Sequence, residues 1–297
     1  MKTVLCLIKR NVKLFFKDKG MFFTALITPV ILLVLYSTFL GNVYRDSFTA
    51  NLPPILSIEE KVIDGLVAAQ LVSSILAVSC VTVAFCANFL MVQDKALGAR
   101  KDFTISPVYP PLLSLSYYLA TLISALMICL TATAICLGYM AWVGWYMTAL
   151  DVCLLFADVL LLTLFGTALS SLINCFLSTQ GQISAVGTVV SSGYGFICGA
   201  YMPISSFGEG LQTVISFLPG TYGTSLIRNH TMRGALAKLT EAGLPEEALQ
   251  ALMDALDCNL YFFDRAVTEP YMYLILGASI AVLIVAYVLL HVRSARH

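Results

Sequence analysis

The sequence predicts an all-α, polytopic membrane protein with six transmembrane helices. Of its 297 residues, 59% are hydrophobic and 11% are charged, whereas soluble domains carry about 25% charged residues. The mean hydropathy is +0.87. Several uncharged runs exceed the roughly 20 apolar residues that a helix needs to cross a bilayer. Lipid is therefore the expected solvent for most of the chain, and a single transmembrane domain should occupy residues 1–297.

Charged residues mark the limits of the expected spans. No charge occurs within residues 20–44, 65–93 or 103–150. The third of these runs is too long for one crossing, and it contains Trp142 and Trp145, a residue type that gathers at membrane–water interfaces. The expected spans lie near residues 21–41, 66–91, 112–137, 149–174, 183–202 and 270–292.

Lysine and arginine residues predict how the chain is oriented. With six spans, the N-terminal segment, residues 92–111 and the C-terminus share one side, and basic residues outnumber acidic ones there. The opposite side is richer in acidic residues. Because basic loops stay in the cytoplasm, we expect a multi-pass protein of the plasma (inner) membrane with both termini in the cytoplasm. A bacterial source is expected.

Residues 1–19 predict an amphipathic helix that lies in the inner interface of the membrane. Leu5, Ile8, Val12, Phe15 and Phe16 recur at helical spacing, with lysines on the opposite side. Such a helix keeps its lysines close to anionic lipid. The alternative is a disordered basic tail that only sets the orientation.

Residues 203–269 form a long outer segment before the last span. Within it, residues 234–257 predict two short polar helices, broken at Gly243-Leu244-Pro245 and packed as a small external cap.

The chain carries no recognisable catalytic or metal-binding motif. It has no Walker A pattern, no HExxH and no GxSxG. The three histidines are scattered along the sequence, and most of the nine cysteines lie in apolar runs, where cysteine acts as a small hydrophobic residue. A net charge of zero gives no case for nucleic acid. We therefore expect no catalytic residue, no metal ligand and no cofactor in this chain.

Four short sequences occur along the chain in an order typical of one family of transporters. FFKDKG (15–20) joins the amphipathic segment to the first span, and TISP (104–107) lies in the charged loop. GYGFICGAYMPISSF (193–207) and FLPGTYGTSLIR (217–228) follow the fifth span. In this order the chain resembles, over essentially its whole length, permease subunits of type-2 ATP-binding-cassette exporters, the multidrug and polysaccharide export type. The family loop commonly reads Glu-Arg-x-x-Gly-Thr, where this chain has QDKALGA (93–99).

The resemblance implies a role for the charged loop at residues 92–111. In such exporters this loop forms a coupling helix that docks on an ATPase subunit, which binds ATP and Mg. The residues expected to contact that subunit are Asp94, Lys95, Arg100, Lys101 and Asp102. The alternative is an ordinary solvated loop whose charges only hold the topology.

The resemblance also implies an outer gate made of two short helices that dip back into the membrane after the fifth span. The residues expected to form the gate are Tyr201, Pro203, Phe207, Phe217, Pro219 and Tyr222. The alternative is a plain external loop with apolar packing.

Polar residues inside the spans suggest where cargo passes. An ionisable residue within a span is a functional hypothesis by default, which points to Asp158. The expected path residues are Asp158, Ser191, Ser192 and Tyr194. Alternatively, Asp158 lies near the outer interface and bonds a neighbouring helix, and the serines join helices to one another.

We interpret the chain as a permease subunit that forms the translocation path as a dimer with a second copy or a paralogue, driven by separate ATPase subunits. Two other classes stay open: a transporter or channel driven by an ion gradient, and a membrane scaffold or immunity protein without a path. The sequence does not identify the cargo.

Overall fold

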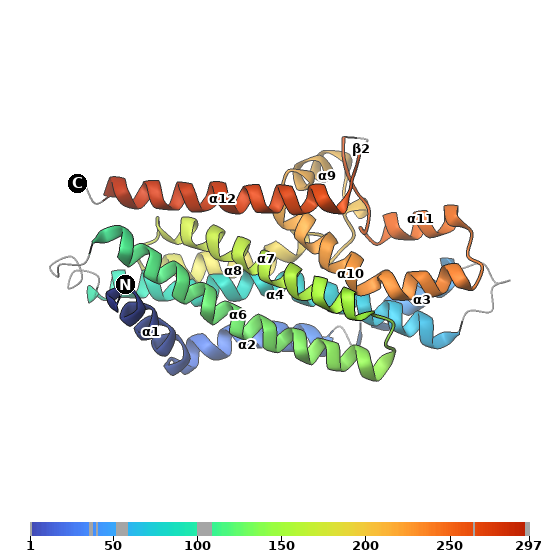
Figure 1. The fold of residues 1–297 in the computed structure, drawn as a ribbon, viewed down its shortest axis with the longest axis horizontal. Helices are drawn as coiled ribbons and strands as arrows, with labels where there is room; N and C mark the ends of the chain where they lie inside the picture. The colour runs from blue at the N-terminus through green and yellow to red at the C-terminus, as the bar shows by residue number, and fades with distance from the viewer. Residues whose placement is uncertain are drawn as a thin grey trace.

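The computed structural model of the chain describes residues 2–35, 38–39, 41–51, 59–99, 109–263 and 265–294. It is an elongated bundle of helices with the N- and C-termini at the same end (Figure 1). Its long helices are α1 (Lys2–Lys17), α2 (Lys19–Leu35), α4 (Glu60–Ala96), α6 (Pro110–Val143), α7 (Ala149–Asn174), α8 (Gln180–Ile197), α10 (Pro219–Glu241) and α12 (Glu269–Ser294). Shorter elements are α3 (Gly41–Asn51), the 3-10 turn η2 (Ile204–Ser206), α9 (Glu209–Ser216), α11 (Glu246–Ala255), β1 (Leu260–Phe262) and β2 (Arg265–Val267).

Helix α4 forms the centre of the bundle. From Gly65 to Asn88 every one of its residues is buried, so it has no face left for lipid. A helix that is apolar on all sides belongs in the interior, and α4 packs against α2, α6, α7, α8 and α10. The remaining helices are therefore held in place by a common partner.

Close approach between α4 and α7 depends on a glycine. A Cβ atom added at Gly166 would lie 2.9 Å from the Cα atom of Val81 and 3.0 Å from the carbonyl oxygen of Cys80. Small residues at such a contact let two helix backbones come together, which is how membrane helices gain packing energy without a hydrophobic driving force.

Four of the six predicted spans are confirmed by length and composition. Among the described residues, the apolar helices long enough to cross a membrane are α4, α6, α7 and α12. The first predicted span, 21–41, coincides with α2 as far as Leu35, and residues 36, 37 and 40 lie outside the described residues. Helices α1 and α2 are together apolar and long enough to count as one bent span. The fifth, 183–202, coincides with α8 as far as Ile197; α8 has 18 residues, is rich in serine, threonine and glycine, and is short for a bilayer core of about 30 Å. Crossing by α2 and α8 therefore stays a prediction.

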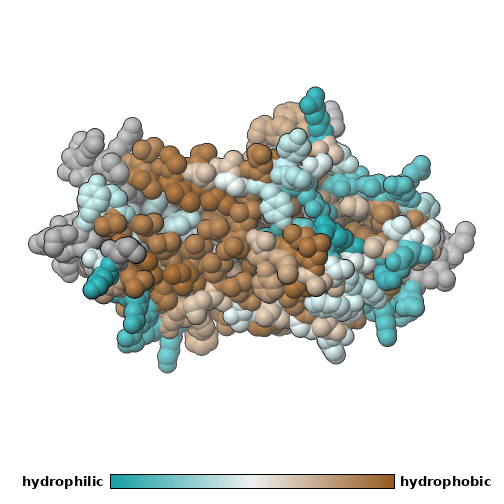
Figure 2. Space-filling model, in the orientation of Figure 1, coloured by the Kyte–Doolittle hydropathy of each residue, from teal (hydrophilic) through white to brown (hydrophobic). Residues whose placement is uncertain are grey.

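Apolar side chains cover the middle of the molecule. Figure 2 shows them over α12, α7 and α6, with hydrophilic side chains gathered towards the two ends. On α12 the exposed side chains include Leu274, Val282 and Leu289, each more than half exposed. In water such a surface would be costly, so this belt is the part of the molecule that faces lipid.

Helix α1 lies against the bundle at the end that carries both termini. It meets α2 at an angle of 74° and packs mainly on α6. Its buried residues are Leu7, Asn11 and Phe15, whereas Leu5 is 70% exposed. The amphipathic helix is thus present. Of the predicted stripe, Phe15 is buried, Ile8, Val12 and Phe16 are half-buried, and Leu5 is exposed.

The outer segment differs from its prediction in one main respect. Residues 219–241 form one continuous helix, α10, instead of a short gate helix followed by a separate short polar helix. Figure 1 shows α10 starting alongside the long helices and ending beyond them beside α11. The predicted break at Gly243 is confirmed, since Gly243 has a φ of 93° and α11 begins three residues later. The two-stranded hairpin of β1 and β2, with Tyr261 opposite Ala266, was not expected.

Candidate functional site

Asp94 joins three helices at the end of α4. It is 6% exposed, and its two carboxylate oxygens accept hydrogen bonds from the Arg10 guanidinium of α1, at 2.5 and 3.1 Å. The Tyr117 hydroxyl of α6 donates to the same carboxylate at 2.6 Å. The hydrogen bond from Arg10 to Asp94 raises the pKa of Arg10 above its ordinary value. We call Arg10, Asp94 and Tyr117 the inner node; it ties α1 to the helix that leads into the charged loop.

Lys95 fixes the end of α4 to the end of α7. Its Nζ atom donates to the carbonyl oxygens of Cys175 and Leu177, each at 2.9 Å. These carbonyls end α7, where a cation is electrostatically favourable. Asp94 and Lys95 thus both have partners within the chain, and α4 continues to Ala96, so the loop is shorter than the predicted 92–111. The other predicted coupling residues, Arg100, Lys101 and Asp102, lie outside the described residues.

A neutral polar network crosses the middle of the bundle. The Asn88 amide nitrogen donates to the hydroxyls of Ser170 and Ser171 at 3.1 and 3.0 Å. The Thr121 hydroxyl donates to the Asn88 carbonyl oxygen at 3.4 Å. All of these residues are buried. In lipid, polar side chains at such depth join helices, so these serines hold α4, α6 and α7 together.

Helix α8 exposes a face unlike that of α12. Ser184, Thr188 and Ser192 are exposed, and each hydroxyl donates to the backbone carbonyl four residues earlier, at 3.2, 2.9 and 2.6 Å. Ser191 is half-buried. The predicted path residues Ser191 and Ser192 therefore lie at or near a surface of small polar residues. Such a surface suits a close neighbouring helix better than it suits lipid.

Tyr194 points inwards from α8. Its hydroxyl is buried without a hydrogen-bond partner among the described residues. It lies against Gly220, where an added Cβ atom would collide with it. Tyr194 thus contacts the start of α10 and not the exposed face of α8.

The predicted gate residues lie in the stretch of chain that runs from the end of α8, through α9, to the start of α10. Tyr201 packs on Gly195 and on the ring of Phe196, and Pro203 and Phe207 flank η2. The Tyr222 hydroxyl donates to the Ser216 carbonyl oxygen at 2.6 Å, which closes the α9–α10 turn. Of the remaining two, Pro219 occupies the first turn of α10, and Phe217 is 58% exposed and packs edge-to-face on Phe262.

A buried ion pair joins the gate region to the outer cap. Arg228 is 1% exposed; its Nη1 donates to the Leu256 carbonyl oxygen at 2.8 Å and to Asp257 at 3.2 Å. Its Nη2 donates to the Gly199 carbonyl oxygen at 3.0 Å. Asp257 also accepts from the backbone N–H of Ile204. We call this set the outer clasp. Burial raises the pKa of Asp257, and the opposing attraction of Arg228 does not cancel that effect.

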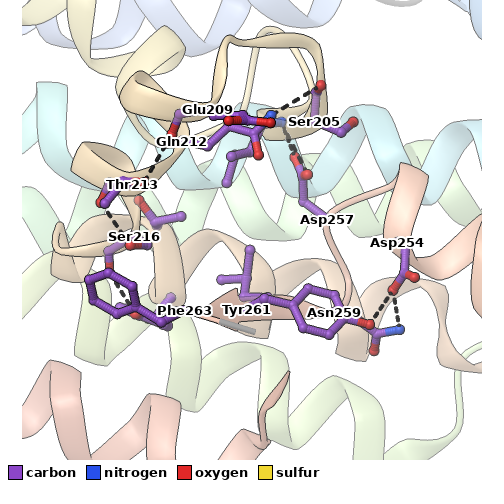
Figure 3. Close-up of a pocket in the computed structure, with 14 residues that line it drawn as sticks. Ser205, Glu209, Gln212, Thr213, Ser216, Asp254, Asp257, Asn259, Tyr261 and Phe263 are labelled. Atoms are coloured by element: carbon purple, nitrogen blue, oxygen red, sulfur yellow. Dashed lines mark hydrogen bonds between the residues drawn. The ribbon is translucent and has the colours of Figure 1, made fainter. Parts of the chain in front are cut away.

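A cavity of about 390 Å³ opens beside the outer clasp. Figure 3 shows it between α9 and the α11–β1 turn, with Glu209, Gln212 and Thr213 on one side and Asp254, Asn259 and Tyr261 on the other. Asp254 accepts hydrogen bonds from Asn259 and Tyr261 at 2.8 and 3.0 Å. Most of the polar groups that line it therefore already have partners within the protein.

Asp158 is enclosed by side chains of α10 and α12. It is 1% exposed; His230 of α10 lies 2.5 Å away through Nδ1, and the Tyr273 hydroxyl of α12 donates to it at 2.6 Å. Sequence reasoning missed His230, because 72 residues separate the two. Asp151, one heptad before Asp158, forms a capping box with Thr148.

Comparison with known proteins identifies the family. A family model described as "ABC-2 type transporter" matches residues 3–231. A comparison with curated proteins finds no match. The matched residues run from α1 through most of α10, and so include the inner node, α8 and the gate region. The chain belongs to the ABC-2 type transporters, and it is a permease subunit of that kind.

Proposed function

We propose that this chain is the membrane subunit of an ATP-driven exporter, and that two such subunits form the path while separate ATPase subunits supply the energy. Family membership supports the ABC-type transporter permease. Export, the dimer and the coupling to an ATPase are the parts that we propose. ATP and Mg belong to the partner subunit, since this sequence has no Walker A pattern.

One observation carries the dimer. The lipid-facing surface of α12 is made of large apolar side chains, whereas the exposed face of α8 also carries a group of small residues, Ser184, Ala185, Thr188 and Ser192, beside the larger Val189, Phe196 and Ile197. Small side chains let helices approach closely. We infer that α8 meets a second permease subunit and that the path runs along this contact.

The inner node supports the coupling. The charged loop leaves α4 two residues after Asp94, and Asp94 is tied to α1 and α6. A partner that moves the loop would therefore move α1, α4 and α6 together. In this proposal Asp94 and Lys95 hold the loop in position, while Arg100, Lys101 and Asp102 remain the predicted contacts with the ATPase.

The orientation follows from the same proposal. Both termini, the end of α4 and the start of α6 lie at one end of the bundle (Figure 1), and we place that end in the cytoplasm of a bacterial cell, with the polar cap of α10 and α11 outside.

Disulfide cross-linking of α8 tests the proposed dimer. The exposed native cysteines Cys6 and Cys153 are first replaced by serine, and Ser192→Cys is then oxidised in membranes. We expect a cross-linked pair of subunits, homodimeric or with a paralogue. The matched control is Val282→Cys on α12, which is 67% exposed and should not cross-link. Equal cross-linking at both positions would reject α8 as the contact.

A further inference from the structure

A cluster of ionisable side chains lies where α7, α10 and α12 meet, and the export mechanism proposed above makes no use of it. Its centre is the pair of His230 and Asp158, whose side chains are each 1% exposed. Around them stand Tyr273 and Glu269 from α12, Arg233 from α10 and Asp151 from α7. Helix α4, which also packs on α10, offers neutral groups to the neighbouring α10 residues: the Ala69 carbonyl accepts from Thr231, and the Ser74 hydroxyl accepts from Arg228.

The geometry fixes which histidine nitrogen holds a proton permanently. Nδ1 of His230 lies 2.5 Å from Oδ2 of Asp158. The other carboxylate oxygen already accepts from the Tyr273 hydroxyl. With Asp158 ionised, its carboxylate can only accept, and Nδ1 is then the donor. Nε2 is then the nitrogen at which His230 gains or loses its charge.

Nε2 is placed to take up a proton. It is buried and has no hydrogen-bond partner among the described residues, and it lies 3.7 Å from Oε2 of Glu269. An unpaired polar atom at such depth carries a cost. A proton on Nε2 converts it into a donor that faces a carboxylate, which removes that cost.

The cluster holds more carboxylates than cations. Asp151, Asp158 and Glu269 stand around one guanidinium, that of Arg233, which pairs with Asp151 and Glu269. A proton on Nε2 would add a positive charge among these three carboxylates. The side chains of Glu269 and Arg233 are 41% and 40% exposed, so they connect the buried imidazole to water at the outer end of α12.

We propose that His230 is a proton-binding site that senses the acidity of the outer compartment. A proton from outer water binds to the lone pair of Nε2, and the new N–H donates to Oε2 of Glu269. Oε1 of Glu269 keeps its bond from Arg233, at 2.9 Å. Outer acidity thus clamps α12 to α10, and Tyr273 and Asp158 extend the clamp to α7. Loss of the proton at higher pH releases Glu269 from the imidazole.

The site is independent of the energy source for transport. It needs neither an ATPase nor a second subunit, because all six side chains belong to one chain. If the export function were disproved, the proton-binding site at His230 would still be supported. If the proton-binding site were disproved, the exporter proposal would be unaffected.

Nitrogen NMR of the full chain in lipid nanodiscs reads the site directly. The chain has three histidines, so ¹⁵N-histidine labelling gives few signals, and His230→Gln identifies those of His230. We expect Nδ1 to carry a proton at every pH from 8 to 5, and Nε2 to gain one within this range, where histidine ordinarily changes its charge. A bare Nδ1, or an Nε2 that stays bare down to pH 5, would overturn the proposal.

Two further variants keep the test decisive if the His230→Gln protein fails to fold. Glu269→Gln removes the carboxylate that faces Nε2 and should move the titration of the His230 signals to lower pH. His291→Gln, near the other end of α12, is the matched control and should leave that titration unchanged. In sealed proteoliposomes, acid on the outer face alone should protonate Nε2. A response to inner acid alone would contradict access from the outer side.

Hydrogen exchange measures the clamp itself. After correction for the intrinsic effect of pH on exchange, the outer turns of α10 and α12 should exchange more slowly at pH 5.5 than at pH 7.5. Glu269→Gln should abolish this difference. A difference that persists in the variant would reject Glu269 as the group that His230 clamps.

Discussion

The outer clasp gives the most quantitative test of how the gate region is held. Arg228 is 1% exposed and bonds three segments: the end of α8 through the Gly199 carbonyl, the end of α11 through the Leu256 carbonyl and the Asp257 carboxylate, and α4 through the Ser74 hydroxyl. Arg228→Met keeps much of the volume and removes every donor. Two carbonyls and one carboxylate then remain buried with fewer partners.

The size of the effect follows from burial. Breaking a buried ion pair by removing one member costs about 3–5 kcal/mol. We expect the lower end, about 3 kcal/mol, because burial already raises the pKa of Asp257 and a proton can neutralise the orphaned carboxylate. At about 2–4 °C per kcal/mol for a large domain, the thermal midpoint should fall by roughly 10 °C. The loss should grow as the pH rises, since the proton then becomes harder to hold.

Thermal unfolding of the purified protein in mild detergent measures this loss. The matched control is Arg45→Met, because Arg45 is 42% exposed and pairs with Glu60 and Asp64 at the surface. Such exposed pairs contribute about 0–1 kcal/mol, so the control should unfold within about 3 °C of the wild type. If Arg228→Met and Arg45→Met lower the midpoint equally, the clasp does not stabilise the outer end and the reasoning fails.

Three further predictions concern the inner node, helix packing and pH. Asp94→Asn removes the charge that holds Arg10; we expect ATPase activity of the assembled complex to fall several-fold while the amount of folded permease is kept, and unchanged activity would separate the node from coupling. Gly166→Ala should destabilise the chain by about 1–3 kcal/mol through overpacking, whereas Gly277→Ala on α12, where an added Cβ meets nothing, should be neutral in the same unfolding assay. Burial raises the pKa of Asp257 above 3.8, so the folded chain holds this proton more tightly than the unfolded chain; its contribution to stability is greatest below about pH 4 and declines as pH rises through the raised pKa. Asp257→Asn should flatten that part of the stability–pH curve, and an unchanged curve would contradict the burial argument.

Hydropathy was sufficient to predict the long apolar helices. Helices α4, α6, α7 and α12 lie where long uncharged runs placed them, because each consists mainly of apolar residues over a bilayer's thickness. The amphipathic helix before the first span and the helix break at Gly243 also followed from local sequence. Each of these elements is determined by residues close together in the chain.

The continuity of α10 was missed because the sequence of its first turns resembles a loop. PGTYGTS (219–225) is rich in residues typical of turns, yet its glycines serve packing. A Cβ at Gly223 would lie 2.6 Å from a Leu162 methyl, and one at Gly234 would collide with the Tyr146 carbonyl. Tertiary contact with α7 and with the turn before it thus overrides low helix propensity, and no local pattern reveals that.

The partners of the buried charged residues could not be predicted from the sequence either. Asp158 stood out as an acid within a span, but its partners His230 and Tyr273 lie 72 and 115 positions further along the sequence. Likewise, Asp94 and Arg10 are 84 positions apart. Periodicity within one helix carries no information on such pairs. One sequence signal did exist: a histidine and a lone intramembrane acid both need partners when buried.

The central claim is that an ATPase binds the end of the bundle that carries both termini and the charged loop. Its most direct test is purification of the chain from its native membrane in mild detergent, with mass spectrometry of the proteins that accompany it. We predict an ATPase with a Walker A motif in equal amount, and its loss when Lys95, Arg100 and Lys101 are changed to glutamate. A permease that emerges without any ATPase, even after gentle cross-linking, would contradict the account and favour a transporter driven by an ion gradient.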